Sequence, residues 1–259
     1  MTGTFNIWNG VHPDFPSAPA RDAVTGGGEG GFEGAEWLGK MEALAGRSLE
    51  QLSQSAAPLC RDYPLAVIAA LCPETPDRPL TVVDFGGGMA SGFAGLRTSL
   101  PRSRPLAFHC VENAAVCAIG RRMFAGFDEL HFHDSLDDAP ARADIVHAGS
   151  SMQYIEDWKG MLARLLRLKP RYLALSDLPA GDIPTFVSVQ SYYDRGMRHW
   201  FWNLDEFVAE LSGLGCRLLY RTRYEGSYLG RHGPYPMDNF QPEHRLGYAS
   251  NLIFAVQDA

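Results

Sequence analysis

The chain has 259 residues, of which 46% are apolar, which supports one sizeable α/β domain with appendages and argues against a second domain of full size. Its formal net charge of −7 disfavours nucleic acid as a partner, because phosphate binding needs a basic surface. No apolar run approaches the roughly 20 residues of a membrane span and the N-terminus has no signal-peptide core, so we expect no membrane association and a cytoplasmic protein.

Residues 1–36 are expected to be a partly flexible N-terminal segment. They contain several prolines and a glycine-rich tract from Gly26 to Gly34, which disfavour regular structure. Their aromatic side chains are too many for a pure linker, so we expect some of them to fold back over the domain. Residues 37–76 follow as a helical extension, with apolar residues at helical spacing over 37–55 and 60–72.

Strand and helix patterns alternate over residues 77–259. Strands are expected at 80–85, 106–112, 129–133, 144–149 and 171–177, and helices at 91–99, 113–125, 158–168 and 204–212, the last capped by Asn203. Unbroken apolar strands between helices predict a parallel sheet covered on both faces, a Rossmann-like α/β fold. The final strands, 216–223 and 249–256, have no helix between them and predict an antiparallel hairpin at one edge.

The five cysteines are Cys60, Cys72, Cys110, Cys117 and Cys216. They form no Cys-x-x-Cys pair, so we expect reduced thiols that pack as small apolar groups. The histidines of the C-terminal half lack H-x-x-x-H spacing, so no metal site is expected.

The clearest functional signal lies between Thr81 and Gly92. One apolar run ends at Asp84 and breaks into glycines at 86–88, and the next apolar run ends at Glu112. In a parallel sheet these two strand ends lie side by side, where a nucleoside pocket forms. Glycine lets the backbone approach a ligand closely, and Glu112 stands where a carboxylate accepts hydrogen bonds from both ribose hydroxyls.

This loop departs from the dinucleotide fingerprint Gly-x-Gly-x-x-Gly. Its third position is Ser91, and an acidic residue precedes the first glycine. Asp84-Phe85-Gly86-Gly87-Gly88 instead resembles the first motif of the class I S-adenosylmethionine-dependent methyltransferases, and the closing hairpin resembles their sheet. An NAD(P)-dependent oxidoreductase is a disfavoured alternative.

Several segments resemble a narrower group, bacterial methyltransferases often found in surface-polysaccharide or small-metabolite gene clusters. These segments are Ile7-Trp8-Asn9-Gly10, Phe15-Pro16-Ser17, Val111-Glu112, Ser150 to Ile155 and Val189-Gln190. The likeness covers nearly the whole chain, and the glycine tract near residues 26–34 departs from it. It implies S-adenosyl-L-methionine as the cofactor.

The resemblance also implies cofactor-binding residues at four strand ends: Asp84, Phe85, Gly86, Gly87, Gly88, Glu112, Asn113, Asp134, Ser135, Gly149 and Ser150. Asp134 stands where such enzymes hold an aspartate near the adenine amino group, and an aspartate that caps a turn is the alternative. Asn113 either stacks near the adenine or caps its helix.

The acceptor is expected over the carboxyl end of the strand 144–149, with His147, Gln153 and Tyr154 as candidate catalytic residues. His147 is a candidate base because imidazole titrates near neutral pH, and a packed, hydrogen-bonded histidine is the favoured alternative. Gln153 and Tyr154 either contact the substrate or anchor the turn. His199, His232 and His244 are further candidate bases.

Two aromatic-rich insertions, 178–203 and 224–248, are expected to wall the acceptor pocket. The candidate substrate-binding residues are Gln190, Tyr192, Tyr193, Trp200 and His232. A loop as long as the second insertion is usually functional or disordered within a compact domain. A homodimer surface is the competing interpretation, because exposed aromatics also mark interfaces.

The sequence therefore predicts an S-adenosylmethionine-dependent methyltransferase for a small polar metabolite or sugar-linked acceptor. O-methylation is favoured, and N- or carboxyl methylation is the alternative. The runner-up is a non-catalytic S-adenosylmethionine-binding module whose aromatic insertions contact a protein partner.

Overall fold

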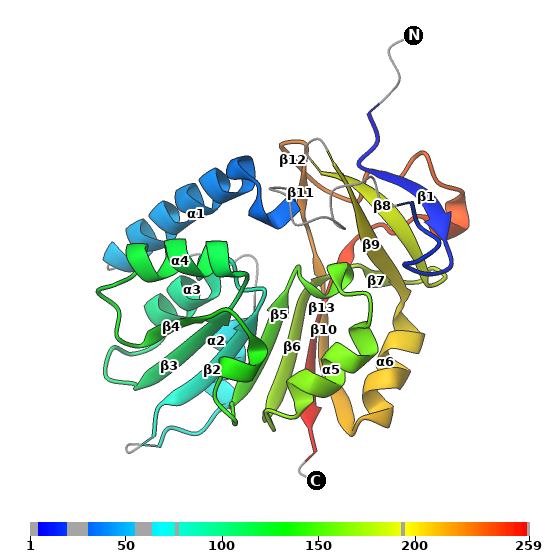
Figure 1. Ribbon diagram of the computed structural model, residues 1–259. Helices are drawn as coiled ribbons and strands as arrows, with labels where there is room; N and C mark the ends of the chain where they lie inside the picture. The colour runs from blue at the N-terminus through cyan, green and yellow to red at the C-terminus, as the bar shows by residue number, and fades with distance from the viewer. Residues whose placement is uncertain (1–4, 20–30, 55–63, 76–77, 193–194, 258–259) are drawn as a thin grey trace.

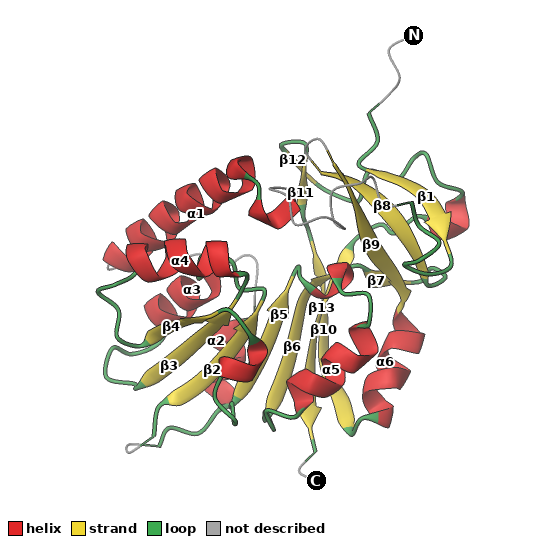
Figure 2. Ribbon diagram, in the orientation of Figure 1, coloured by secondary structure: helices red, strands yellow, loops and turns green. Residues whose placement is uncertain are grey.

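The computed structural model describes residues 5–19, 31–54, 64–75, 78–192 and 195–257. These residues form a large sheet flanked by helices and a smaller sheet beside its carboxyl end (Figures 1 and 2). The strands of the large sheet are β2 (Leu80–Phe85), β3 (Leu106–Val111), β4 (Leu130–His133), β5 (Ile145–Gly149), β6 (Tyr172–Leu178), β10 (Cys216–Tyr224) and β13 (Ala249–Val256).

The order of the large sheet is β10-β13-β6-β5-β2-β3-β4. β13 runs antiparallel to both of its neighbours, and the other pairs are parallel. This arrangement confirms the predicted α/β class, the parallel core and the closing antiparallel pair. The chain runs outward from β2 through β3 to β4 and then returns to β5 on the other side of β2. Ligands bind at such a switch point, outside the carboxyl ends of the strands.

Helices cover both faces of the large sheet. They are α1 (Ala35–Ser53), α2 (Leu65–Leu71), α3 (Ser91–Ser99), α4 (Ala114–Met123), α5 (Trp158–Leu166) and α6 (Leu204–Gly213). On one face α2, α3 and α4 bury a core that includes Ile68 and Phe93, and α1 packs outside α3 and α4. On the other face α5 and α6 bury a core that includes Leu162 and Phe207. Each apolar helix face is thereby removed from water, which is the main favourable term in folding.

Two asparagines fix where helices begin after strands. Asn113 Oδ1 accepts the Val116 backbone N–H at 3.0 Å, and Asn203 Oδ1 accepts the Glu206 backbone N–H at 3.0 Å. Each bond satisfies a donor that the helix start leaves unpaired, a contribution of about 1 kcal/mol. The predicted cap at Asn203 is confirmed, and Asn113 caps α4.

The smaller sheet was not predicted from the sequence. Its strands are β1 (Trp8–His12), β7 (Ala180–Gly181), β8 (Phe186–Tyr192) and β9 (Arg195–Asn203), in the order β1-β8-β9-β7. β1 comes from the N-terminal segment and pairs antiparallel with β8, with Trp8 opposite Gln190. Residues 8–12 are therefore a strand, and much of the insertion 178–203 is sheet.

The insertion 224–248 contains a short hairpin, β11 (Ser227–Tyr228) with β12 (Arg231–His232), and a 3-10 helix, Pro242–His244. Side chains of this insertion, including Tyr235 and Phe240, share a core with Trp8, Phe186 and Phe201 of the smaller sheet. The second insertion is thus packed together with Ile7 and Trp8 of the N-terminal segment in one unit. Figure 1 shows this unit beyond the tips of β5, β6 and β13.

Four cysteines, Cys72, Cys110, Cys117 and Cys216, are free and buried, as predicted, and Cys60 lies outside the described residues. Across the described ranges, no helix combines the length and the apolar character that a membrane crossing requires. Within those same ranges, no three His, Cys, Asp or Glu side chains are grouped as metal ligands.

Candidate active site

The glycine loop that follows β2 makes a tight turn with an open outer side. Gly86 and Gly88 have φ values of +70° and +53°, a conformation that L side chains rarely adopt. A Cβ on Gly86 would lie 2.4 Å from Ser151 Cβ, so this glycine lets the turn after β5 approach the loop. A Cβ on Gly88 would have as its nearest neighbour Met41 Sδ, at 3.9 Å. Space for a ligand therefore lies over Gly88.

Glu112 follows β3 directly and lies beside the glycine loop. Its carboxylate accepts the Asn113 backbone N–H at 2.8 Å and the Asn113 side-chain amide at 3.2 Å. Burial raises the pKa of Glu112, while hydrogen bonds from the backbone N–H groups of Asn113 and Gly88 act in the opposite direction. The side chain keeps some accessible surface. A half-buried carboxylate thus lies beside the uncovered outer side of Gly88 at the switch point, an arrangement suited to a ribose.

Asp84 lies under the glycine loop instead of in front of it. Its side chain is buried, and its Oδ2 would lie 2.7 Å from a Cβ on Gly87 and 2.9 Å from one on Gly92. Its Oδ1 lies 2.7 Å from His147 Nδ1, and His147 Nε2 lies 3.0 Å from Ser176 Oγ. The three side chains form a buried polar chain across β2, β5 and β6.

The sequence left two alternatives for His147, a candidate base and a packed, hydrogen-bonded histidine. The structure shows the second arrangement. It is fully buried, and both ring nitrogens lie within hydrogen-bond distance of Asp84 and Ser176. A ring engaged at both nitrogens is poorly placed to take a proton from an acceptor. Its geometry instead orients the Asp84 carboxylate beneath the loop.

Gln153 and Tyr154, which lie in the turn after β5, have different contacts. Gln153 is buried, and its amide donates to Ser150 Oγ at 3.2 Å, so it anchors the turn. Ser150 has a φ of +53°, and the Ser151 hydroxyl donates to the Phe85 carbonyl at 2.9 Å. Tyr154 points away from this turn, because its hydroxyl donates to Gln190 Oε1 in β8 at 2.9 Å. Tyr154 therefore connects the large sheet to the smaller one.

The remaining candidates at the strand ends have identifiable partners. Asp134 forms an ion pair with Arg121 at 2.6 Å, which lowers the pKa of its exposed carboxyl. Ser135 Oγ accepts the Asp137 backbone N–H at 3.2 Å and caps the 3-10 helix Leu136–Asp138. Phe85 is half-buried against the core on the α5 and α6 side, and Gly149 is buried. An adenine contact by Asp134 stays a prediction, now with Arg121 as a competitor for the carboxylate.

Only some of the candidate substrate-binding residues lie at the site. Gln190 reaches Tyr154 and belongs to the site. Trp200 does not, because it is buried in the core and its indole N–H donates to the Ile155 carbonyl at 3.1 Å. His232 is exposed in β12. Tyr192 ends β8 with its side chain outside the description, and Tyr193 lies outside the described residues.

Phe32 is one of the N-terminal aromatic residues that the sequence analysis expected to fold back over the domain, although it was not among the candidate site residues. It lies in the 3-10 helix Gly31–Glu33, and its carbonyl accepts the Asn113 side-chain amide at 3.3 Å. Its ring centroid lies 5.1 Å from that of Trp37 and 5.1 Å from that of Tyr154. Phe32 therefore contacts residues that follow both β3 and β5. Its place in a glycine-rich stretch gives no periodic signal, so the number of aromatic residues in the segment was the only indication of its position.

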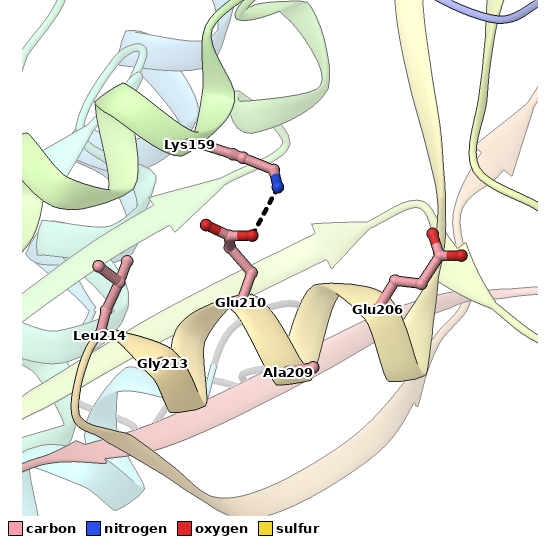
Figure 3. Close-up of a pocket in the computed structure, with 6 residues that line it drawn as sticks. All are labelled: Lys159, Glu206, Ala209, Glu210, Gly213 and Leu214. Atoms are coloured by element: carbon pink, nitrogen blue, oxygen red, sulfur yellow. Dashed lines mark hydrogen bonds and ion pairs between the residues drawn. The ribbon is translucent and has the colours of Figure 1, made fainter.

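The described surface also has a hollow of about 600 Å³ that lies apart from the strand ends (Figure 3). Its lining comes from α5, α6 and the residue after α6, where Lys159 and Glu210 form an ion pair at 2.6 Å. It contains none of the candidate residues, so the strand ends remain the candidate site.

No family model matches this chain, and no curated protein matches its sequence. Among solved structures, LepI in complex with SAM has a TM-score of 0.52 and 12% identity, over 86% of this chain and 53% of LepI. A candidate S-adenosylmethionine dependent methyltransferase from Listeria monocytogenes has a TM-score of 0.51 and 10% identity, over 74% of this chain and 97% of its own. A pericyclic reaction enzyme has a TM-score of 0.50 and 13% identity, over 86% of this chain and 54% of its own.

These similarities define the fold. The chain has the Rossmann-like fold of the class I methyltransferases, with the seven-stranded order and the antiparallel β13 described above. It spans about half the length of LepI and nearly all of the Listeria protein.

Proposed function

We propose that this protein is an S-adenosylmethionine-dependent methyltransferase that acts on a small polar acceptor. The observation that carries the proposal is the position of Glu112 beside the open backbone of Gly88 at the switch point of the sheet. The structural neighbours support it, since one is described in complex with SAM and another as a candidate methyltransferase. The resemblance to methyltransferases of polysaccharide and small-metabolite gene clusters favours a small polar acceptor.

The residues present fit this cofactor. Gly88 leaves room over the loop, and Glu112 offers the ribose hydroxyls a carboxylate that is already fixed by Asn113. Phe32 stands between the Glu112–Asn113 side and Tyr154, where it would shield the nucleoside from water. When bound, the cofactor would supply a methyl group on a positively charged sulfur.

The chain's own contribution would be binding, orientation and water exclusion. Asp84 and His147 set the shape of the loop from below, and Tyr154, held by Gln190, stands on the acceptor side. In-line displacement at a methyl carbon is accelerated mainly by alignment of the two reacting groups. Such alignment requires neither a metal nor a covalent intermediate on the protein.

Calorimetric titration tests the proposal. S-adenosylhomocysteine and NADH would be titrated separately into the purified protein. We expect saturable binding of S-adenosylhomocysteine and no binding of NADH. Binding of NADH alone would support the oxidoreductase and reject the proposal. Methyl transfer to a metabolite panel then separates an enzyme from a non-catalytic binding module, which would bind the ligand and release no methylated product.

A further inference from the structure

A second hollow, of about 330 Å³, lies at the edge of the large sheet, where β7, β10, β13 and the second insertion meet. We call it the arginine hollow. Its lining includes Arg221 and Arg223 of β10, Asp182 after β7, Tyr248 of the second insertion and Ser250 of β13.

The arginine hollow is separate from the candidate cofactor site. β10 is the outermost strand on its side of the large sheet, five positions from β3, which Glu112 follows. Neighbouring strands lie about 4.8 Å apart, so about 24 Å separate β10 from β3. In the register of the sheet, Arg223 lies opposite Ser250, and Ser250 lies opposite Leu178 at the end of β6. The hollow is therefore level with the carboxyl end of β6 but far from the ribose position.

The floor of the hollow is fixed by contacts between β7, β13 and the second insertion. Ser250 is buried, and its hydroxyl donates to the Ala180 carbonyl at 2.9 Å. Gly181 packs so closely against the buried Leu246 that a Cβ on the glycine would lie 2.5 Å from Leu246 Cδ1. Because these contacts already set the shape of the floor, a ligand would not have to organise it.

The two arginines lie on the same side of β10, because they are two residues apart in the strand. The guanidinium carbon of Arg223 lies 4.1 Å from the centroid of the Tyr248 ring. Stacking on an aromatic face restricts a guanidinium group and leaves the N–H donors in its plane able to bind oxygen atoms. Arg223 is therefore oriented by Tyr248 at the rim of the hollow.

The charge of these arginines is not neutralised by an ion pair. Acidic residues outnumber basic ones in this chain by 30 to 23, and Arg78, Arg121 and Arg164 each pair with an aspartate. Within the described part of the chain, Arg221 and Arg223 form no such pair. The lining has one carboxylate, that of the exposed Asp182, against the two guanidinium groups. The hollow thus has an excess of positive charge on an acidic protein.

Charged side chains on an edge strand also prevent its pairing with other strands. Arg217 is exposed on β10, four residues before Arg221, and lies outside the lining of the hollow. It has the same charge on the same strand without the hollow, which makes it the matched control for Arg221 and Arg223.

We propose that the arginine hollow binds a small dianionic oxyanion, such as the phosphate group of a metabolite. This goes beyond the proposed function, because the hollow lies apart from the cofactor site. Guanidinium groups bind phosphate oxygens through paired, charge-assisted hydrogen bonds. Two guanidinium groups favour a dianion over a monoanion, whereas Asp182 repels both and limits the affinity.

NMR titration of the full chain with inorganic phosphate, and separately with acetate, tests the proposal. Both titrations are done at constant ionic strength and slightly alkaline pH, where phosphate is mostly a dianion. We expect a saturable shift of the backbone amide signal of Gly247, which lines the hollow, and tighter binding of phosphate than of acetate. Arg221→Gln and Arg223→Gln should each weaken phosphate binding at least about threefold, and Asp182→Asn should strengthen it about twofold, as expected for charges near the surface.

Two control variants remove the same charges outside the hollow. Arg217→Gln and the exposed Asp128→Asn should leave phosphate binding unchanged. All five variants should keep the dispersed spectrum of the folded wild type and its affinity for S-adenosylhomocysteine. A shift that does not saturate, binding of acetate as tight as that of phosphate, or an equal loss in Arg217→Gln would overturn the oxyanion site. Saturable phosphate binding by a protein that does not bind S-adenosylhomocysteine would support this site and reject the proposed function.

Discussion

The two sheets of this protein position polar groups in different ways. In the large sheet, Asp84, His147 and Ser176 bond to one another across adjacent strands, and each partner is fixed by the strand register. In the smaller sheet, aromatic packing dominates, and the described structure leaves Trp8 Nε1, His199 Nδ1 and Trp202 Nε1 without hydrogen-bond partners. The polar groups of the large sheet are therefore paired with one another, whereas these three nitrogens of the smaller sheet are buried among aromatic rings.

The largest expected effect follows from breaking the buried polar chain. Asp84→Ala removes the partner of His147 Nδ1 in a site without solvent, which should lower the free energy of unfolding by about 3–5 kcal/mol. Urea denaturation measures this change. The exposed Asp128→Ala is the matched control and should stay near the wild-type value.

Tyr154→Phe gives the corresponding change on the acceptor side. It removes one hydrogen bond to Gln190 at a half-buried position, so we expect a loss of about 1 kcal/mol. Equal losses for Asp84→Ala and Tyr154→Phe would contradict the contrast between the two halves.

The next prediction concerns Glu112. Glu112→Ala should weaken S-adenosylhomocysteine binding at least tenfold, because a hydrogen bond to a charged group contributes roughly 1.5–3 kcal/mol. Calorimetry measures the affinity, and the exposed Glu50→Ala is the control. Unchanged affinity in Glu112→Ala would remove this residue from the cofactor site.

Two alanine substitutions in the glycine loop test a smaller effect, and Gly88→Ala is the control for Gly86→Ala. Gly86→Ala and Gly88→Ala share the strain of a positive φ, but only the first drives a Cβ into Ser151. Gly86→Ala should therefore be less stable than Gly88→Ala by about 1–3 kcal/mol, the usual cost of overpacking. Thermal denaturation compares the two, and equal stability would show that the loop yields to the turn after β5.

The smallest expected effect is a pH dependence at the edge of the large sheet. Burial and the neighbouring His131 and His133 lower the pKa of His109 to about 4, and its Nδ1 lies 2.9 Å from His133 Nε2. Below about pH 6.5 the unfolded chain takes up protons that the folded chain resists, so the free energy of unfolding should fall as pH falls toward 4. His109→Gln should make this fall shallower, whereas the exposed His232→Gln should leave its slope unchanged.

The large sheet could be predicted from the sequence because its signals are local. The strand at 80–85 was predicted with the observed bounds, and that at 106–112 to within one residue, since continuous apolar runs bounded by turn residues mark buried parallel strands. Glu112 and the glycine loop were found for the same reason, because each lies directly after such a run.

The acceptor side could not be predicted because its structure depends on pairing between distant segments. β1 is five residues long, contains Gly10, and pairs with a distant strand, with Trp8 opposite Gln190. Trp200 was wrongly predicted to bind the substrate for a related reason. Sequence alone does not distinguish an aromatic residue that lines a pocket from one that is buried in a core.

A crystal structure with S-adenosylhomocysteine bound tests the central claim most directly. The account predicts the ribose on Glu112, the backbone of Gly88 against the ligand, and the sulfur facing the side that holds Tyr154. A ligand bound elsewhere, or a sulfur that faces away from the smaller sheet, would contradict it.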